Sequence, residues 1–538
     1  MLREPEFGSD GASELRRPKK ATERRNVATN YLTAVVTALV AFVTTPILTH
    51  ELGIARYGVW ALIGSLIPFL ELLELGFASV TVAFVGRHLE LEEDEKVAST
   101  INTSFLILSV LGVIAFAGVV MFTIFLPDII STIPKSLIGQ ARFLLLLLAF
   151  DMALSIPMDT FGGALMGLQR FDLVNYSTIV VIVSQGIAMV IVLVLHGGLV
   201  ALGLVTVAIS LMGQASRFVL LHRQLPGFHL SLRQFDRGIL RTYTRLSGWY
   251  SLSQISAAVI ELSDVLIVGA AAGIEAAAIY AVAQRLGLLP VRIVQPRIYP
   301  LLTTAAELSA RDNESGLRDR TDKVVRYVLY LSVPVAIALG FLAGPTVEAW
   351  VGPLYRKAAS VIGLLCLASV VQVWALSLRT TLSGARRPRL PAVLLGLEAA
   401  LHVGLGIVLA SRYGPVGMAW AVLIGVVTME AILLLPLAYR KLGDSFRRRA
   451  IGFVRALGVP ALCAGVLGWA LGRGGGPLFA FTDGHGRIAG LAVVGTAGLL
   501  VLAVFYGVLL ASMPPVQRRP LLARSRVWLG RLRARIHG

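Results

Sequence analysis

The chain contains fourteen apolar stretches that are each long enough to cross a lipid bilayer as a helix. About 20 apolar residues cover the hydrocarbon core, and hydrophobic residues make up 56% of this sequence. We therefore expect an all-α polytopic membrane protein with about 14 transmembrane helices. The expected helices cover residues 27–49, 57–85, 98–126, 142–166, 173–195, 198–221, 247–271, 274–301, 325–344, 358–382, 390–410, 414–437, 451–471 and 488–511.

The basic residues are divided unevenly between the two sides of this arrangement. Of the 49 Lys and Arg residues, 38 fall in one set of alternate loops and tails and 8 in the other, and three lie within 274–301. Cytoplasmic loops carry the excess of basic residues, so both termini are predicted to be cytoplasmic. The net charge of +18 then needs no nucleic-acid partner, and we expect none.

The sequence carries no motif of a catalytic or metal site. The two cysteines, Cys366 and Cys463, both lie in apolar stretches, and no phosphate-binding loop or zinc motif occurs. The loops are too short to hold the soluble domain that a membrane glycosyltransferase or ligase usually needs. We expect neither an enzyme nor a bound cofactor or metal, although H⁺ or Na⁺ could be transported.

Two pairs of similar segments indicate an internal repeat. Residues 53–62 align with 273–282 at an offset of 220, and residues 165–170 align with 382–387 at an offset of 217. Helices 1–6 and 7–12 are therefore predicted to form two six-helix lobes related by a parallel repeat, followed by two more helices. The predicted organisation is a cytoplasmic basic tail (1–26), an N-lobe (27–221), a cytoplasmic amphipathic linker (222–246), a C-lobe (247–437), helices 13 and 14 (438–511) and a basic amphipathic cytoplasmic tail (512–538).

Three arginines of the eighth predicted helix lie at unusual depth. An ionisable residue at the centre of a membrane helix costs at least about 2.5–3.5 kcal/mol, so it usually faces a cavity or a partner. Arg285 is expected near mid-bilayer, with Arg292 seven residues later on the same face and Arg297 near the cytoplasmic end. We interpret them as fixed cations for an anionic substrate. For Arg292 and Arg297 the alternative is that their side chains extend to the headgroups.

Four carboxylates in the membrane segments are candidates for binding a coupling ion. Glu261 and Asp264 are one turn apart in the seventh helix, and Glu71 and Glu74 are one turn apart in the second. These helices flank the expected lobe interface. The open alternative is structural ion pairing between the lobes, and Glu74 could also be purely structural.

Other buried polar residues receive weaker assignments. Glu398 and His402, one turn apart in helix 11, could form a proton relay, but we favour a packed, hydrogen-bonded pair. Asp151 and Asp159 in helix 4 and Glu430 in helix 12 are single charges to which the sequence gives no preferred role.

Five short motifs stand out along the chain: Leu52-Gly53 with Tyr57-Gly-Val-Trp60, Leu73-Glu-Leu-Gly76, Gly167-Leu-Gln-Arg-Phe171, Ser263-Asp-Val-Leu-Ile-Val-Gly269 and Ile279-Tyr-Ala-Val-Ala283. They resemble those of the Wzx-type polysaccharide flippases, a family of the multidrug/oligosaccharidyl-lipid/polysaccharide exporter superfamily. The resemblance extends over most of residues 26–440. This chain has Glu74 where the family usually has Asp, so a carboxylate is kept at that position on a longer side chain.

The resemblance implies that the protein flips an undecaprenyl-pyrophosphate-linked oligosaccharide to the outer leaflet by ion-coupled alternating access. Arg285 and Arg292, with Arg297, would bind the diphosphate, and Arg56 and Arg87 would serve in gating or leaflet anchoring. The implied partners are the lipid-linked oligosaccharide, the membrane, and a polysaccharide polymerase with its chain-length proteins.

Three alternatives stay open at this point. The chain could be a lipid II flippase or a cation-coupled multidrug exporter of the same superfamily. It could also be a polytopic glycosyltransferase or ligase, or a scaffold without transport activity in a polysaccharide assembly complex.

Overall fold

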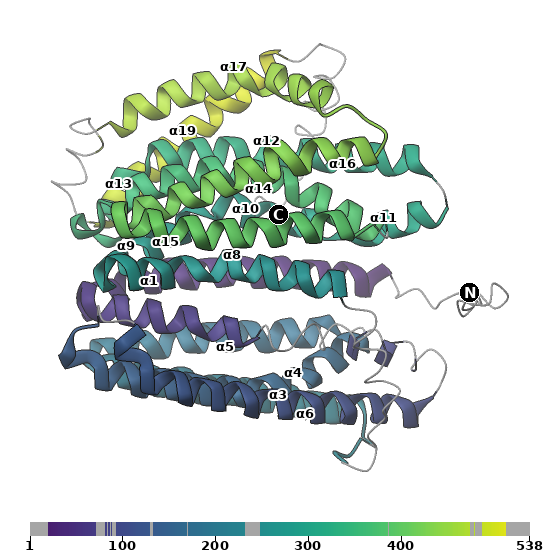
Figure 1. The fold of residues 1–538 in the computed structure, drawn as a ribbon, viewed down its shortest axis with the longest axis vertical. Coiled ribbons are helices and arrows are strands. Elements are labelled where there is room, and N and C mark those ends of the chain that lie inside the picture. The colour runs from purple at the N-terminus through teal and green to yellow at the C-terminus, as the bar shows by residue number, and fades with distance from the viewer. Residues whose placement is uncertain are drawn as a thin grey trace, which may run out of the picture. The chain divides into compact units, whose positions relative to one another are not determined.

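The computed structural model describes residues 20–512 apart from several internal gaps. These gaps are residues 72–80, 83, 87, 89–92, 130–132, 169, 227, 232–247, 312, 386, 474–477 and 479–486. Every regular element in the described part of the chain is helical, which confirms the predicted all-α class (Figure 1). The amphipathic linker and both terminal tails lie largely or wholly outside the described residues.

The chain forms two compact units, residues 1–275 and 276–538, within which most contacts between residues lie. The lobe limits predicted from the sequence, 27–221 and 247–437, stay a prediction. The long helices of unit 1 are α1 (Lys20–Glu71), α3 (Asp94–Ile129), α4 (Ile138–Gly167), α5 (Phe171–Val194), α6 (Gly198–Gln224) and α8 (Gly248–Ala272).

Unit 2 is built from longer and shorter helices. Its elements are α9 (Ile274–Gly287, which begins at the boundary), α10 (Leu289–Ile298), α11 (Pro300–Ala310), α12 (Glu314–Phe341), α13 (Ala343–Val351), α14 (Ala358–Gly384), α15 (Arg389–Gly425), the π-helix η5 (Val426–Leu434), α16 (Leu435–Lys441), α17 (Phe446–Gly472) and α19 (Arg487–Ser512).

The described residues contain eleven helices long and apolar enough to cross a membrane, or twelve if the bent pair formed by α9 with α10 and α11 is one span. Two long helices are each interrupted by a glycine with non-helical angles, α1 at Gly53 and α15 at Gly414. When these breaks are counted, each of the fourteen predicted segments has its own stretch of helix, although part of the second lies outside the described residues.

The connection between the predicted helices 274–301 and 325–344 is mostly helix. It contains α11 and the first turns of α12. The 28 residues of α12 extend about 42 Å at 1.5 Å per residue, which exceeds the roughly 30 Å of the hydrocarbon core. Charged residues at its start therefore continue the helix beyond the apolar layer.

Backbone details repeat between the two halves. Gly53 and Gly273, 220 residues apart, both have positive φ, and so do Gly198 and Gly414, 216 residues apart. An L-residue is strained at such φ values, so glycine suits both members of each pair.

The helix ends within residues 165–170 and 382–387, the second pair of similar segments, also have corresponding contacts. The backbone N–H of Arg170 donates to Leu165 O at 2.9 Å, and that of Arg387 donates to Leu382 O at 2.8 Å. A Cβ on Gly167 would meet Val82 O at 3.0 Å, and one on Gly384 would collide with Leu302 O. The same local hydrogen bonding and close packing thus recur at the two segments that the sequence predicted to be related.

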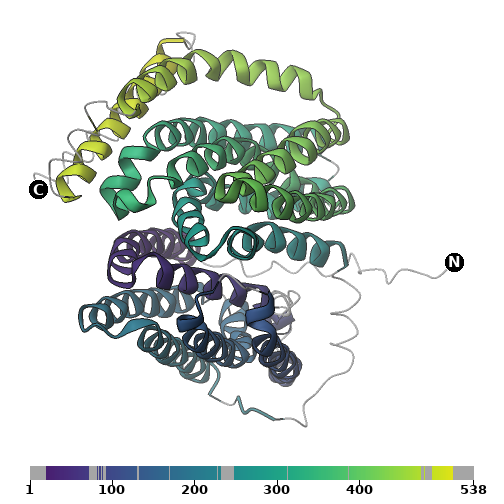
Figure 2. The same ribbon diagram turned by 60° about the vertical axis from the view of Figure 1, so that its left-hand side comes forward.

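The two C-terminal helices pack together within unit 2. Figures 1 and 2 show α17 and α19, coloured from yellow-green to yellow, as neighbours. A cluster that includes Leu457, Val501 and Phe505 joins them to Val325 and Leu329 of α12. Burial of such side chains contributes roughly 1.5–3 kcal/mol each in water. Inside a bilayer, close packing is the larger contribution.

Candidate functional site

The helix predicted at 274–301 is bent. Helix α9 ends at Gly287 and α10 begins at Leu289, and the two parts of the span differ in direction by 44°. The predicted helix is therefore not continuous between Arg285 and Arg292, because the bend lies between them, and their placement on one face stays a prediction.

The three arginines differ in exposure. Arg285 is half-buried, whereas Arg292 and Arg297 are exposed. The guanidinium of Arg297 lies 5.6 Å from the ring centroid of Tyr327 in α12, which is within the range of a cation–π contact. Arg285 is thus the arginine of this group that the protein surrounds most closely.

The end of α9 is held tightly in unit 2. A Cβ added to Gly287 would lie 2.7 Å from Cβ of Leu365 in α14, and Sγ of Cys366 lies 4.0 Å from Gly287 O. This close approach of α14 fixes the backbone two residues after Arg285 and so limits where the guanidinium can reach.

The acidic pair of the seventh predicted helix lies on α8 in unit 1. Glu261 is exposed, and Asp264 is buried with 4% of its surface accessible. Both residues interact with neighbouring groups. The neighbouring hydroxyl of Ser263 is buried without a hydrogen-bond partner, so α8 presents polar groups in two different environments.

The remaining predicted residues belong to the first two predicted helices and their flanks. Arg56 is exposed on α1, three residues after the break at Gly53. Glu71 ends α1, and only its backbone is described. Glu74 and Arg87 lie outside the described residues.

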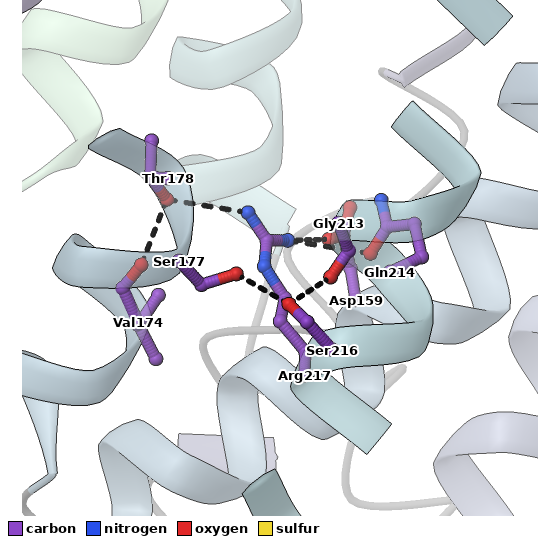
Figure 3. Close-up of polar contacts among 8 residues, drawn as sticks. All are labelled: Asp159, Val174, Ser177, Thr178, Gly213, Gln214, Ser216 and Arg217. Atoms are coloured by element: carbon purple, nitrogen blue, oxygen red, sulfur yellow. Dashed lines mark hydrogen bonds and ion pairs between the residues drawn. The ribbon is translucent and has the colours of Figure 1, made fainter. Parts of the chain in front are cut away.

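Unit 1 contains a polar cluster that the sequence did not predict (Figure 3). Arg217 of α6 forms an ion pair with Asp159 of α4, with Nη1 2.8 Å from Oδ1. The same guanidinium donates more weakly to Thr178 of α5 and to Gln214, at 3.4 Å each. Arg217 lies seven residues before the end of α6, or about 10 Å inside it.

The cluster joins three helices and extends to further hydroxyl groups. Ser177 of α5 and Ser216 of α6 lie 2.8 Å apart, and Ser216 donates to Gly213 O at 2.7 Å. Nε of Arg217 is buried and has no hydrogen-bond partner. The arrangement can hold a charge pair at membrane depth and has one guanidinium donor left over.

Arg217 and Arg379 lie within four residues of the ends of the predicted helices 198–221 and 358–382, and both lie inside helices that qualify as membrane spans. Each pairs with a carboxylate of a neighbouring helix, Arg217 with Asp159 and Arg379 with Glu430. The sequence feature that could have indicated these ion pairs is an acidic and a basic residue at similar depth in two different predicted helices. Only the fold can tell whether those helices are neighbours.

Comparison with known proteins identifies the family. A sequence model of the polysaccharide biosynthesis protein family matches residues 24–303, slightly more than half of the 538-residue chain. The chain belongs to this family. The flippase family named from the sequence motifs is thereby confirmed. A curated relative, the uncharacterized membrane protein EpsK of Bacillus subtilis (strain 168), is 21% identical over 417 residues, which are 76% of this chain and 81% of EpsK.

Solved structures show the fold of this family member. The lipid II flippase MurJ in an inward closed conformation has a TM-score of 0.66 at 13% identity and covers 90% of this chain and 98% of its own. An inward-facing multidrug resistance MATE transporter of the MOP superfamily has a TM-score of 0.62 at 14% identity, over 76% of this chain and 98% of its own. The protein is thus a multi-pass membrane protein with the fold of flippases and transporters, and it is placed with these proteins rather than with enzymes.

Proposed function

We propose that the protein flips an undecaprenyl-pyrophosphate-linked oligosaccharide, the precursor of a surface polysaccharide, from the inner to the outer leaflet of a bacterial inner membrane. Ion exchange across the membrane would drive alternating access, with both termini cytoplasmic. The match to the polysaccharide biosynthesis family supports a polysaccharide precursor as the substrate. In this proposal the protein makes and breaks no covalent bond.

Arg285 is the residue that we assign to the diphosphate. It is a half-buried guanidinium at the end of α9, next to the bend in the span. A guanidinium presents paired donors that match phosphate oxygens. Arg292 and Arg297 are assigned lesser roles, since both are exposed and Arg297 already contacts Tyr327.

The coupling ion is assigned to carboxylates, with Asp264 and Glu261 as the leading pair. Asp264 is buried and Glu261 is exposed one turn before it, so a proton or sodium ion could reach the pair from one side. Glu71 and Glu74 stay secondary candidates, and Arg56 and Arg87 keep the proposed role in gating or anchoring. A polymerase and its chain-length proteins are the proposed partners.

The proposal is tested with the purified full chain in proteoliposomes that contain an undecaprenyl-pyrophosphate-linked oligosaccharide. Flipping is measured as the rate at which the glycan becomes accessible to a membrane-impermeant lectin. Loss of a charged hydrogen-bond donor costs about 1.5–3 kcal/mol, so Arg285→Ala should slow flipping by about 10- to 100-fold. Arg285→Lys should keep part of the rate.

Arg412→Ala is the matched control, because Arg412 is an exposed arginine of the same unit. This variant should flip the glycolipid at the wild-type rate. Wild-type flipping by Arg285→Ala would remove Arg285 from the site. Failure of the wild type with this lipid, together with flipping of lipid II or export of a cationic drug, would move the protein to another branch of the superfamily. Failure with all three probes would favour a scaffold.

A further inference from the structure

A group of ionisable side chains lies buried in unit 2 around the ion pair of Arg379 and Glu430. Glu398 and His402 of α15 and Glu430 of η5 have 2–3% of their surfaces accessible. Arg379 of α14 lies beside them with 18% of its side chain accessible. The three elements pack against one another, so four polar residues share one apolar part of the helix bundle.

Arg379 is paired with one of the two glutamates. Its Nη1 lies 2.6 Å from Oε1 of Glu430, while Oε2 of Glu430 is buried without a hydrogen-bond partner. Glu398 lies within electrostatic reach of both Glu430 and Arg379. A Cβ on Gly425, the last residue of α15, would lie 3.8 Å from Cγ of Glu398, so the backbone just before η5 passes close to the Glu398 side chain.

The charges of this group do not balance. With the imidazole of His402 neutral, two ionised carboxylates and one guanidinium leave one net negative charge in an apolar interior, and an uncompensated buried charge costs several kcal/mol. A buried group in this situation takes up a proton and becomes neutral. Because Glu430 is already paired with the guanidinium of Arg379, we assign the proton to Glu398.

We infer that Glu398, Glu430 and Arg379 form a proton-binding site in the C-terminal unit. One proton adds to a carboxylate oxygen of Glu398 and makes the group neutral; its release restores the net negative charge. The charges that act on Glu398 among the described residues are those of Glu430 and Arg379. The imidazole of His402, one helical turn away, can receive the proton on its way out.

A metal ion is a poorer fit than a proton. Among the described residues, no three His, Cys, Asp or Glu side chains converge as a metal site would require. One oxygen of Glu430 is already taken by Arg379. A proton needs a single carboxylate oxygen, which Glu398 supplies.

The π-helix is an element through which this site could change its geometry. Residues 426–434 form a nine-residue π segment that carries Glu430, and π segments are rare and concentrate at functional sites. Conversion to an α-helix would shift the register by one residue and turn Glu430 by about 100° relative to the preceding helix. That rotation would separate Glu430 from Arg379, so the charge of the site would be linked to the shape of the helix.

The use of this proton in transport rests on the proposed function, but the site itself can be tested without substrate. Infrared difference spectra of the purified full chain at neutral pH should contain the carbonyl stretch of a protonated carboxylic acid. This band should weaken in Glu398→Gln and also in Glu430→Gln, because one remaining carboxylate is balanced by Arg379. Glu314→Gln, which removes an exposed carboxylate paired with Arg387, should leave the band unchanged.

Retention of the full band in both Glu398→Gln and Glu430→Gln would overturn the inference. A second result would also overturn the inference: the wild type lacks this band, and Na⁺ raises its melting temperature in a way that Glu398→Gln abolishes. The bound ion would then be sodium rather than a proton. Folding is monitored by size-exclusion profile, and reversible loss of the wild-type band at alkaline pH tests the site with no substitution. If the band behaves as expected but no glycolipid is flipped, the proton site stands and the proposed function fails.

Discussion

The guanidinium of Arg217 and the carboxylate of Asp159 lie 2.8 Å apart and join α6 to α4 inside the N-terminal unit. Both side chains are partly accessible, 20% for Arg217 and 33% for Asp159. The pair is therefore neither a fully exposed surface contact nor a fully desolvated one. Its energetic effect should lie between those limits.

Removal of one partner of this pair should destabilise the N-terminal unit. Arg217→Ala leaves Asp159 without its nearest cation inside a membrane helix, and we expect a loss of about 1–3 kcal/mol. The measurement is the melting temperature of the detergent-solubilised full chain. The double variant Arg217→Gln with Asp159→Asn should recover much of the loss, since no unpaired charge is left. A double variant less stable than Arg217→Ala would contradict this account.

The repeat makes a second prediction, about two equivalent glycines. Gly167 and Gly384 each end a helix where a neighbouring helix passes closely, near Val82 O and Leu302 O respectively. An added methyl group cannot fit without moving the backbone, so each Gly→Ala variant should lose about 1–3 kcal/mol of stability.

Gly404→Ala is the control for these variants. Gly404 lies inside α15 with no atom within 4 Å of an added Cβ, so alanine should be neutral there or stabilise by up to about 1 kcal/mol. The melting temperatures of the three variants are compared in one detergent. Equal effects at all three positions would show that helix propensity, rather than close packing, decides the outcome.

The fold was predictable from sequence to the extent that it depends on one-dimensional patterns. Apolar segment length located the helices, and matches such as Gly53 with Gly273 located the repeat, because a left-handed backbone position needs glycine wherever it occurs. The bend between Gly287 and Leu289 lies next to Pro290, and a proline disturbs the helix at the carbonyl four residues before it. The sequence could therefore have located a kink here, but not its direction, which depends on packing such as the close approach of Gly287 to Leu365.

The polar sites were less predictable than the helices. Asp159 and Glu430 each gave no signal as single acidic residues in apolar segments. Their arginine partners, Arg217 and Arg379, lie near predicted helix ends, where extension to the headgroups is the ordinary explanation. Only the packing of α4 with α6, and of α14 with η5, converts these isolated charges into pairs.

A third prediction concerns pH and a loop outside the membrane spans. Asp444 accepts a hydrogen bond from the backbone N–H of Ser445 at 2.7 Å and pairs with Arg449 at 2.6 Å. Burial acts to raise the pKa of Asp444. The hydrogen bonds from Ser445 and Arg449 and the charges of Arg449 and Arg318 more than offset this, so the pKa is lowered overall.

The sign of the pH effect follows from that lowered pKa. A carboxylate whose pKa is lower in the folded state stabilises the fold above its unfolded pKa, and this stabilisation is lost as the pH falls through the folded value. The ordinary pKa of Asp is 3.8, so the wild type should lose stability below that pH more steeply than Asp444→Asn. The check is melting temperature against pH for both proteins, and parallel curves would contradict the assignment.

The last prediction concerns the ion pair of Arg379 with Glu430. Glu430 has 2% of its side chain accessible, so Arg379→Ala leaves a buried carboxylate with no counter-charge, and removal of one partner of a buried pair costs about 3–5 kcal/mol. A second substitution, Glu430→Gln, should restore most of the melting temperature because the stranded charge is gone. Arg387→Ala breaks an exposed pair with Glu314 in the same unit and should cost about 1 kcal/mol or less. If Arg379→Ala were no more harmful than Arg387→Ala, then Glu430 would already be neutral in the wild type, and the proton would have to be assigned to Glu430 rather than to Glu398.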